Sequence, residues 1–142
     1  MKKVSDILSR KGSYVESVTP ETIVIEALTL MANKNIGSVA VLHNDKFVGL
    51  MTERDYSRKV ILKGRASNDT TVGEIMTSNG PSITANDSVE HCMEIMSSQN
   101  LRYLPVIENN KLAGIISIND VVTETILNQK ETIEHLQNYI HS

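Results

Sequence analysis

The chain has 142 residues, a formal net charge of −3 and 40% apolar residues, which is typical of a globular protein of about one domain. The negative charge argues against general binding to nucleic acid or to an anionic membrane. No apolar run approaches the length of a membrane span. The start of the chain lacks the apolar core of a signal peptide, so we expect a cytoplasmic protein.

The first half of the chain is expected to form a strand, a helix, two strands and a second helix. The residue before Pro20 is pushed out of the helical region, and apolar residues then recur at helical spacing. Two short apolar runs follow, separated by turn-forming residues. The elements are an extended segment at 17–19, a helix capped by Thr22 and ended by Asn35 and Gly37, strands at 39–42 and 47–51, a turn at 44–46, and a helix at 53–62.

The second half repeats the first at a constant offset of 65 residues. Residues 18–56 overlay residues 83–121 without a gap, and the segment 4–8 resembles 72–76 at a slightly different offset. We therefore predict an α+β fold of tandem β-α-β-β-α repeats with pseudo-two-fold symmetry, in which the two half-open sheets bury their apolar faces together. The predicted domains are residues 1–65, with an N-terminal helix, and residues 66–142, with an extended C-terminal helix.

A short motif ends both repeats: glycine, two apolar residues, a hydroxyl residue, any two residues, then aspartate. The copies are 49–55 and 114–120. A carboxylate one turn inside a helix can accept hydrogen bonds from both hydroxyls of a ribose, and a hydroxyl at the helix start can bind phosphate beside free N–H groups. The same spacing is also a helix capping box, which needs no ligand. Both interpretations remain open from the residues alone.

The duplicated motif and the two β-α-β-β-α repeats resemble the CBS-domain pair, or Bateman module, and in particular small stand-alone bacterial proteins of this type. The resemblance implies regulatory binding of adenine nucleotides (AMP, ADP, ATP or NAD, and sometimes S-adenosylmethionine) in clefts between the repeats. It also implies a regulated protein partner. We find no converging nucleophile, base and acid, so we expect no enzyme activity. The alternative is a protein-interaction or oligomerisation adaptor with vestigial nucleotide sites.

Cationic residues are unevenly distributed between the repeats. Arg54 and Arg58 lie four residues apart on one helix face, which suits phosphate binding or a solvated basic face equally well. The resemblance implies that Arg102 reaches a phosphate held at Asp55, so we expect the Asp120 site to have no matching cation. The candidate nucleotide-binding residues are Thr52, Arg54, Asp55, Arg58, Arg102, Ser117 and Asp120, with no catalytic residue and no metal ligand among the predictions.

Two further patterns lie outside this motif. Cys92, the only cysteine, excludes an intrachain disulfide framework and a multi-cysteine zinc site, and we expect it in the core. In the C-terminal segment, apolar residues recur at spacings of three, four and seven, which predicts a long helix with a stripe for another helix. We expect a homodimer, in part because the resemblance implies one, as CBS pairs commonly assemble as flat homodimers; the alternative is that the stripe packs on its own domain. The stripe comprises Val122, Ile126, Ile133, Leu136 and Ile140, with Gln129 on the same seam.

Overall fold

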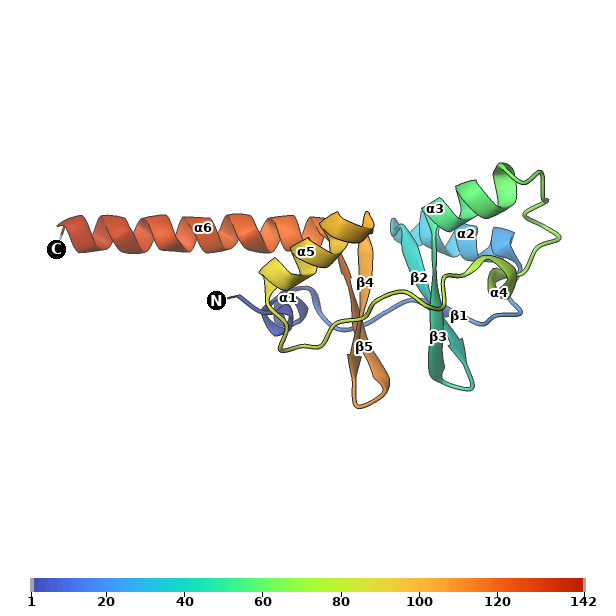
Figure 1. Cartoon of the computed structure of the whole chain (residues 1–142), viewed down its shortest axis with the longest axis horizontal. Helices are drawn as coiled ribbons and strands as arrows, with labels where there is room; N and C mark the ends of the chain where they lie inside the picture. Colours follow the sequence, from blue (N-terminus) through green and yellow to red (C-terminus); the bar gives the residue numbers. More distant parts are fainter. Residues whose placement is uncertain (1, 142) are drawn as a thin grey trace. The chain divides into compact units, whose positions relative to one another are not determined.

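The computed structural model describes residues 2–141 and divides the chain into two compact units. Unit 1 contains the N-terminal segment up to Ser13 and the chain from Pro81 onward, and unit 2 is Tyr14–Gly80. Both units mix helices with strands (Figure 1), so the predicted α+β class is confirmed. None of the helices within residues 2–141 combines the length and the apolar character that a bilayer-spanning helix needs.

Unit 2 contains the first repeat. Its three-stranded sheet has the order β1-β2-β3, with β1 parallel to β2 and β2 antiparallel to β3. The elements are β1 (Ser17–Val18), α2 (Val24–Lys34), β2 (Ser38–His43), β3 (Lys46–Thr52), α3 (Glu53–Tyr56), the π-helical turn η1 (Ser57–Ile61) and α4 (Val72–Ile75).

Unit 1 contains the second repeat, and it has the same order of elements. In place of a first strand, Ile83 forms a single parallel bridge with Val106, and β4 and β5 pair antiparallel. The predicted repeat of the fold is therefore present in both halves. The elements are α1 (Val4–Lys11), α5 (Val89–Gln99), β4 (Tyr103–Glu108), β5 (Lys111–Ser117) and α6 (Ile118–His141).

The turns form where asparagine and aspartate predict them. Asn44 and Asp45 have φ of 51° and 64°, and Asn109 and Asn110 have φ of 50° and 63°, which is the geometry of two-residue hairpins of type I′. These residue types tolerate the left-handed region better than others. The predicted cap of the first long helix is wrong, because α2 begins after Ile23 and the Thr22 hydroxyl accepts the N–H of Thr19 instead.

Each unit has its own apolar core, and each core includes a short helix that precedes the other repeat in the chain. Val4 and Ile7 of α1 lie in the core of the second repeat, although α1 precedes the first repeat in the chain. Val72 and Ile75 of α4 lie in the core of the first repeat. The predicted boundary after residue 65 follows the sequence repeat, whereas packing assigns α1 to the unit formed by the second repeat.

The thiol of Cys92 is buried in the core of unit 1, as expected. Burial, followed by the nearby Asp87, raises the pKa of this thiol from 9.0 to about 11. We therefore expect no alkylation of the native protein at pH 8 over hours and complete alkylation in denaturant. Mass spectrometry of labelled protein checks this. Rapid labelling of the native chain would contradict the burial of Cys92.

Candidate functional site

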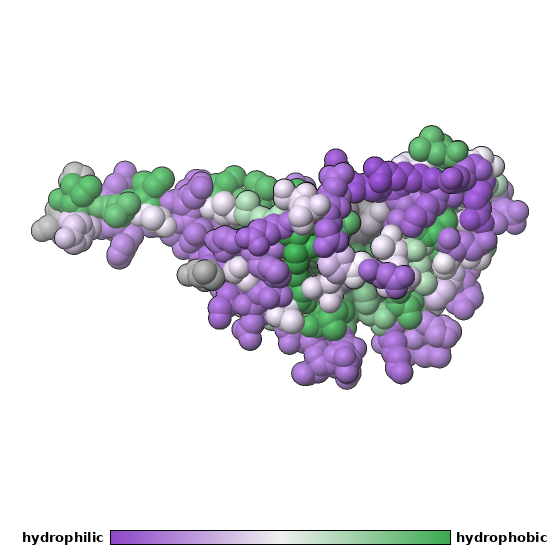
Figure 2. Space-filling view, viewed as in Figure 1, coloured by the Kyte–Doolittle hydropathy of each residue, from purple (hydrophilic) through white to green (hydrophobic). Residues whose placement is uncertain are grey.

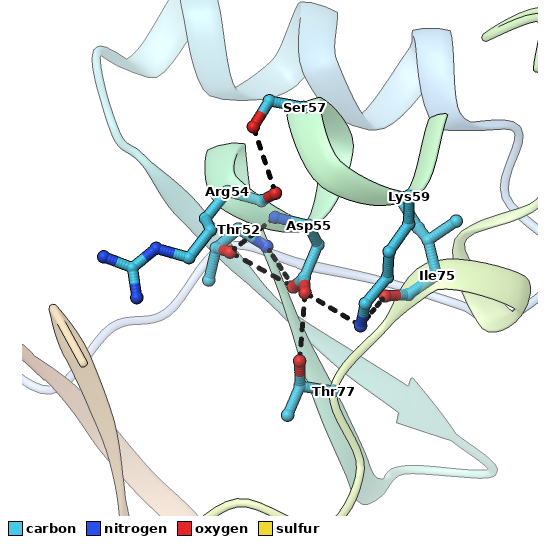
Figure 3. A network of polar contacts seen from close by, with 7 residues as sticks. All are labelled: Thr52, Arg54, Asp55, Ser57, Lys59, Ile75 and Thr77. Atoms are coloured by element: carbon cyan, nitrogen blue, oxygen red, sulfur yellow. Dashed lines mark hydrogen bonds and ion pairs between the residues drawn. The ribbon is translucent and has the colours of Figure 1, made fainter. Parts of the chain in front are cut away.

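In the first repeat, the motif closes a complete capping box at the start of α3 (Figure 3). Thr52 ends β3 with an extended backbone, and its hydroxyl accepts the N–H of Asp55 at 3.1 Å. In return, Asp55 Oδ2 accepts the backbone N–H of Thr52 at 3.0 Å and its hydroxyl at 3.1 Å. The capping interpretation of the sequence is thus correct for this repeat, and it occupies one oxygen of the carboxylate.

The other oxygen of Asp55 is occupied as well. Asp55 Oδ1 accepts the Thr77 hydroxyl at 3.0 Å and forms an ion pair with Lys59 Nζ at 3.0 Å. Lys59 Nζ also donates to the carbonyl of Ile75 at 2.9 Å. The Asp55 side chain is only 8% exposed, so it links β3, η1 and the segment after α4 from inside the unit (Figure 3).

In the second repeat, the equivalent carboxylate is held differently. Ser117 accepts the N–H of Asp120 at 3.1 Å, and Asp120 Oδ2 accepts the N–H of Ser117 at 2.8 Å. Lys11 Nζ reaches the same Oδ2 atom at 2.7 Å and also donates to the carbonyl of Ile115 at 3.0 Å. These contacts converge on one oxygen, and the side chain of Asp120 is 20% exposed.

The glycine of each motif lies close to another segment of its unit. Gly49 is approached by the segment that precedes the second repeat, and Gly114 by the segment that precedes the first repeat. A Cβ on Gly49 would lie 2.8 Å from the carbonyl oxygen of Thr77, and one on Gly114 would lie 2.7 Å from Leu8 Cδ2. Leu50, the residue after Gly49, exchanges two backbone hydrogen bonds with Thr77, at 2.8 and 3.0 Å. A larger residue at Gly49 would push the backbone that carries Thr77 away from Asp55, whereas at Gly114 only the flexible Leu8 side chain would have to move.

Lys11 and Thr77 were not predicted as neighbours of the two aspartates, whereas the Lys59–Asp55 ion pair fits the interpretation of a basic face salt-bridged to Asp55. The expectation that the Asp120 site has no cation is wrong, because Lys11 lies against it. The similarity between residues 4–8 and 72–76 was the available signal. Segment 4–8 packs on the core of the second repeat and is followed by Lys11, which contacts Asp120. Segment 72–76 packs on the core of the first repeat and is followed by Thr77, which contacts Asp55.

The predicted arginines are placed as follows. Arg54 is half-buried and its side chain extends away from Asp55 in Figure 3, while Arg58 is exposed at the start of the π-helical turn. Arg102 is exposed in unit 1 beside β4, and its carbonyl accepts the N–H of Ile118 at 2.9 Å. Any role of Arg102 at the Asp55 site stays a prediction.

The chain is similar to known proteins over nearly its whole length. It is 32% identical to the mitochondrial CBS domain-containing protein CBSX3 of Arabidopsis thaliana over 96% of this chain and 71% of that protein. A solved structure of a protein with CBS domains from Burkholderia ambifaria shares 40% identity, with a TM-score of 0.86, over 90% of this chain and 96% of that one.

A further solved structure has the same fold at lower identity. It is the CBS domain pair of protein MJ0100 in complex with 5′-methylthioadenosine and S-adenosyl-L-methionine, with 24% identity and a TM-score of 0.77, over 87% of this chain and 99% of that one. The family model described as "CBS domain" matches residues 4–61 and 72–126, which are the two repeats. The chain belongs to the CBS-domain family and carries a pair of these domains.

Proposed function

We propose that this CBS pair is a regulatory module that binds an adenine nucleotide, such as AMP, ADP, ATP or NAD. The observation that carries the proposal is the carboxylate of Asp120, which is partly exposed and engaged through one oxygen beside a lysine. A ribose presents two neighbouring hydroxyls, and Asp120 Oδ1 can accept from them without dismantling the cap of α6.

The two aspartates are unequal in their readiness for a ligand. Asp55 already accepts hydrogen bonds at both oxygens and is nearly buried. A ribose at Asp55 must displace Thr77 or Lys59 before it can bind, whereas a ribose at Asp120 displaces neither Ser117 nor the cap. We therefore assign the stronger nucleoside site to Asp120, with Ser117 beside it.

Lys11 supplies the positive charge for a phosphate at this site. Its ammonium group has three donors, of which two are used by Asp120 and Ile115. Phosphates bind well to such a flexible point charge. The remaining predicted residues of unit 2, Thr52, Arg54 and Arg58, belong to a second site around Asp55 in this proposal.

The fold supports a ligand of this class. MJ0100, which shares the fold, was solved with two ligands that both contain adenosine. A pair of CBS domains can therefore accommodate an adenosine moiety, and the choice of nucleotide depends on the residues of the individual chain.

Binding of AMP and adenosine to the purified full chain, measured by calorimetry, tests the role of Lys11. We expect Lys11→Met to weaken AMP about ten-fold or more, because a charge-assisted hydrogen bond contributes about 1.5–3 kcal/mol. Adenosine should bind to this variant about as well as to the wild type. Lys3→Met is a matched control, since Lys3 is an exposed lysine at the start of the same helix. Equal weakening of AMP and adenosine by Lys11→Met would contradict the phosphate role.

An adaptor function is the second candidate, and the geometry of Asp55 favours it. A carboxylate held by four contacts at the start of α3 stabilises the fold without any ligand. If neither aspartate binds a nucleotide, the module acts through protein contacts alone, with a homodimer or a regulated protein as partner. Absence of binding by AMP, ATP and NAD at millimolar concentration, in a folded protein, would favour this candidate.

A further inference from the structure

The C-terminal helix α6 carries an apolar stripe that the rest of the described chain leaves uncovered. The apolar members of this stripe are about half exposed or more, from 47% at Ile126 to 74% at Ile140, and every residue from 131 to 140 is exposed. In Figure 2, apolar side chains gather along one edge of α6. An isolated helix of this length is marginal in water, so this part of α6 needs a partner to be stable.

The stripe has the spacing of a heptad seam. Position a is isoleucine three times, and position d is valine, glutamine and leucine. In parallel coiled coils, isoleucine at a with leucine at d favours two strands. The a positions are Ile126, Ile133 and Ile140, and the d positions are Val122, Gln129 and Leu136.

The a and d positions of the seam carry no charged residue, and three acidic residues on other faces of α6 are paired within the chain. Asp120 pairs with Lys11, Glu124 with Arg10 and Glu131 with Lys2. The cations all come from α1 and the residues just before it, which therefore cover a different side of α6. Two neutral apolar stripes can pair without like-charge repulsion, so the seam fits a second copy of itself.

We propose that two copies of this chain associate through α6 as a parallel two-stranded coiled coil in which the Gln129 side chains face each other. In a parallel pair, each d residue lies opposite its own copy, so the two Gln129 amides can hydrogen-bond to one another. In an antiparallel pair with the same layers, Gln129 lies against Ile133, and a buried amide is left unsatisfied. The glutamine therefore selects the parallel orientation. This inference is independent of nucleotide binding.

The size of the seam sets the strength of the association. A large aliphatic side chain offers roughly 100 Å² of removable apolar surface, so five half-exposed side chains supply about 300 Å² per chain. A standard specific interface buries about 800 Å² per partner. The coil is short of that size and has under three heptads, so we expect a dimer that dissociates at micromolar concentration.

Sedimentation velocity of the full chain between about 1 and 100 µM tests the seam. We expect the dimer mass at the upper end and a monomer for Ile133→Glu. His135→Glu is the matched control, because it places the same charge two residues away, off the seam, and should remain dimeric. Circular dichroism checks that both variants are folded. A wild-type monomer at 100 µM, or a dimer that Ile133→Glu leaves intact, would overturn the proposal.

Disulfide cross-linking tests the orientation, and it does not depend on the charged variants. Leu136→Cys should cross-link to itself under mild oxidation, because a parallel pair places the two residues opposite each other. In the antiparallel pair, residue 136 faces residue 126 of the other chain, about 15 Å further along the helix at 1.5 Å per residue. A mixture of Leu136→Cys and Ile126→Cys that gives mainly the mixed dimer would overturn the parallel arrangement. The wild-type chain, whose Cys92 is buried, controls for other cross-links.

Discussion

Replacement of Asp55 by alanine is expected to lower the free energy of unfolding of unit 2 by about 2–3 kcal/mol. Loss of the cap of α3 accounts for about 1 kcal/mol of this. Loss of the charge-assisted hydrogen bond from Thr77 accounts for most of the rest. The Lys59 pair adds little, because the Lys59 side chain is 43% exposed and water can solvate it. Hydrogen exchange of the amides in β2 and β3 measures the effect within unit 2.

Asp120→Ala is the matched control for this prediction. Asp120 caps α6 in the same way, yet its side chain is more exposed and its contacts reach one oxygen only. We expect its removal to lower the stability of unit 1 by about 1 kcal/mol. Equal losses in the two variants would contradict the unequal roles that we assign to Asp55 and Asp120.

Arg10→Ala is expected to destabilise unit 1 by about 2–3 kcal/mol, since it leaves the carboxylate of Glu124 buried without its cation. Glu124 is 2% exposed, and within the described residues its Oε1 atom pairs with Arg10 but makes no hydrogen bond of regular geometry. Breaking a buried pair commonly costs about 3–5 kcal/mol. The value here is lower because Arg10 is 42% exposed. Chemical denaturation measures the change.

A double variant distinguishes the stability lost through an unpaired buried charge from the stability lost through poorer packing. Arg10→Met combined with Glu124→Leu removes both charges and keeps most of the volume, so its stability should return to within about 1 kcal/mol of the wild type. If the double variant is as unstable as Arg10→Ala, the cost comes from packing between α1 and α6, and the charge argument is wrong.

The sequence could predict the parts of the fold that depend on local pattern. The 65-residue repeat, the two hairpins at Asn44 and Asn109 and the long C-terminal helix follow from spacing and from residues that tolerate positive φ. The hairpins and the helix are set by residues close in sequence. Because the two halves repeat, the elements predicted in one half can be compared with those predicted in the other.

The packing of the short helices and the neighbours of the aspartates could not be predicted in the same way. Lys11 and Asp120 are 109 residues apart, and nothing in their local spacing brings them together. The α1 helix packs on the later repeat because its apolar face, with Val4 and Ile7, completes that core. The motif also does not contain Thr77, whose hydroxyl donates to Asp55 and holds this side chain in its capping role.

Calorimetric titration of the full chain with AMP, ATP and NAD, carried out in parallel on Asp120→Asn and Asp55→Asn, tests the central claim most directly. These isosteric changes remove one charge each and keep the side-chain volume. We predict that at least one nucleotide binds the wild type, and that Asp120→Asn weakens it about ten-fold or more, as loss of a hydrogen bond to a charged group requires. Asp55→Asn should weaken that binding less. The claim that Asp120 holds the nucleotide would be contradicted if Asp55→Asn weakened binding while Asp120→Asn did not. It would also be contradicted if none of the three nucleotides bound the wild type.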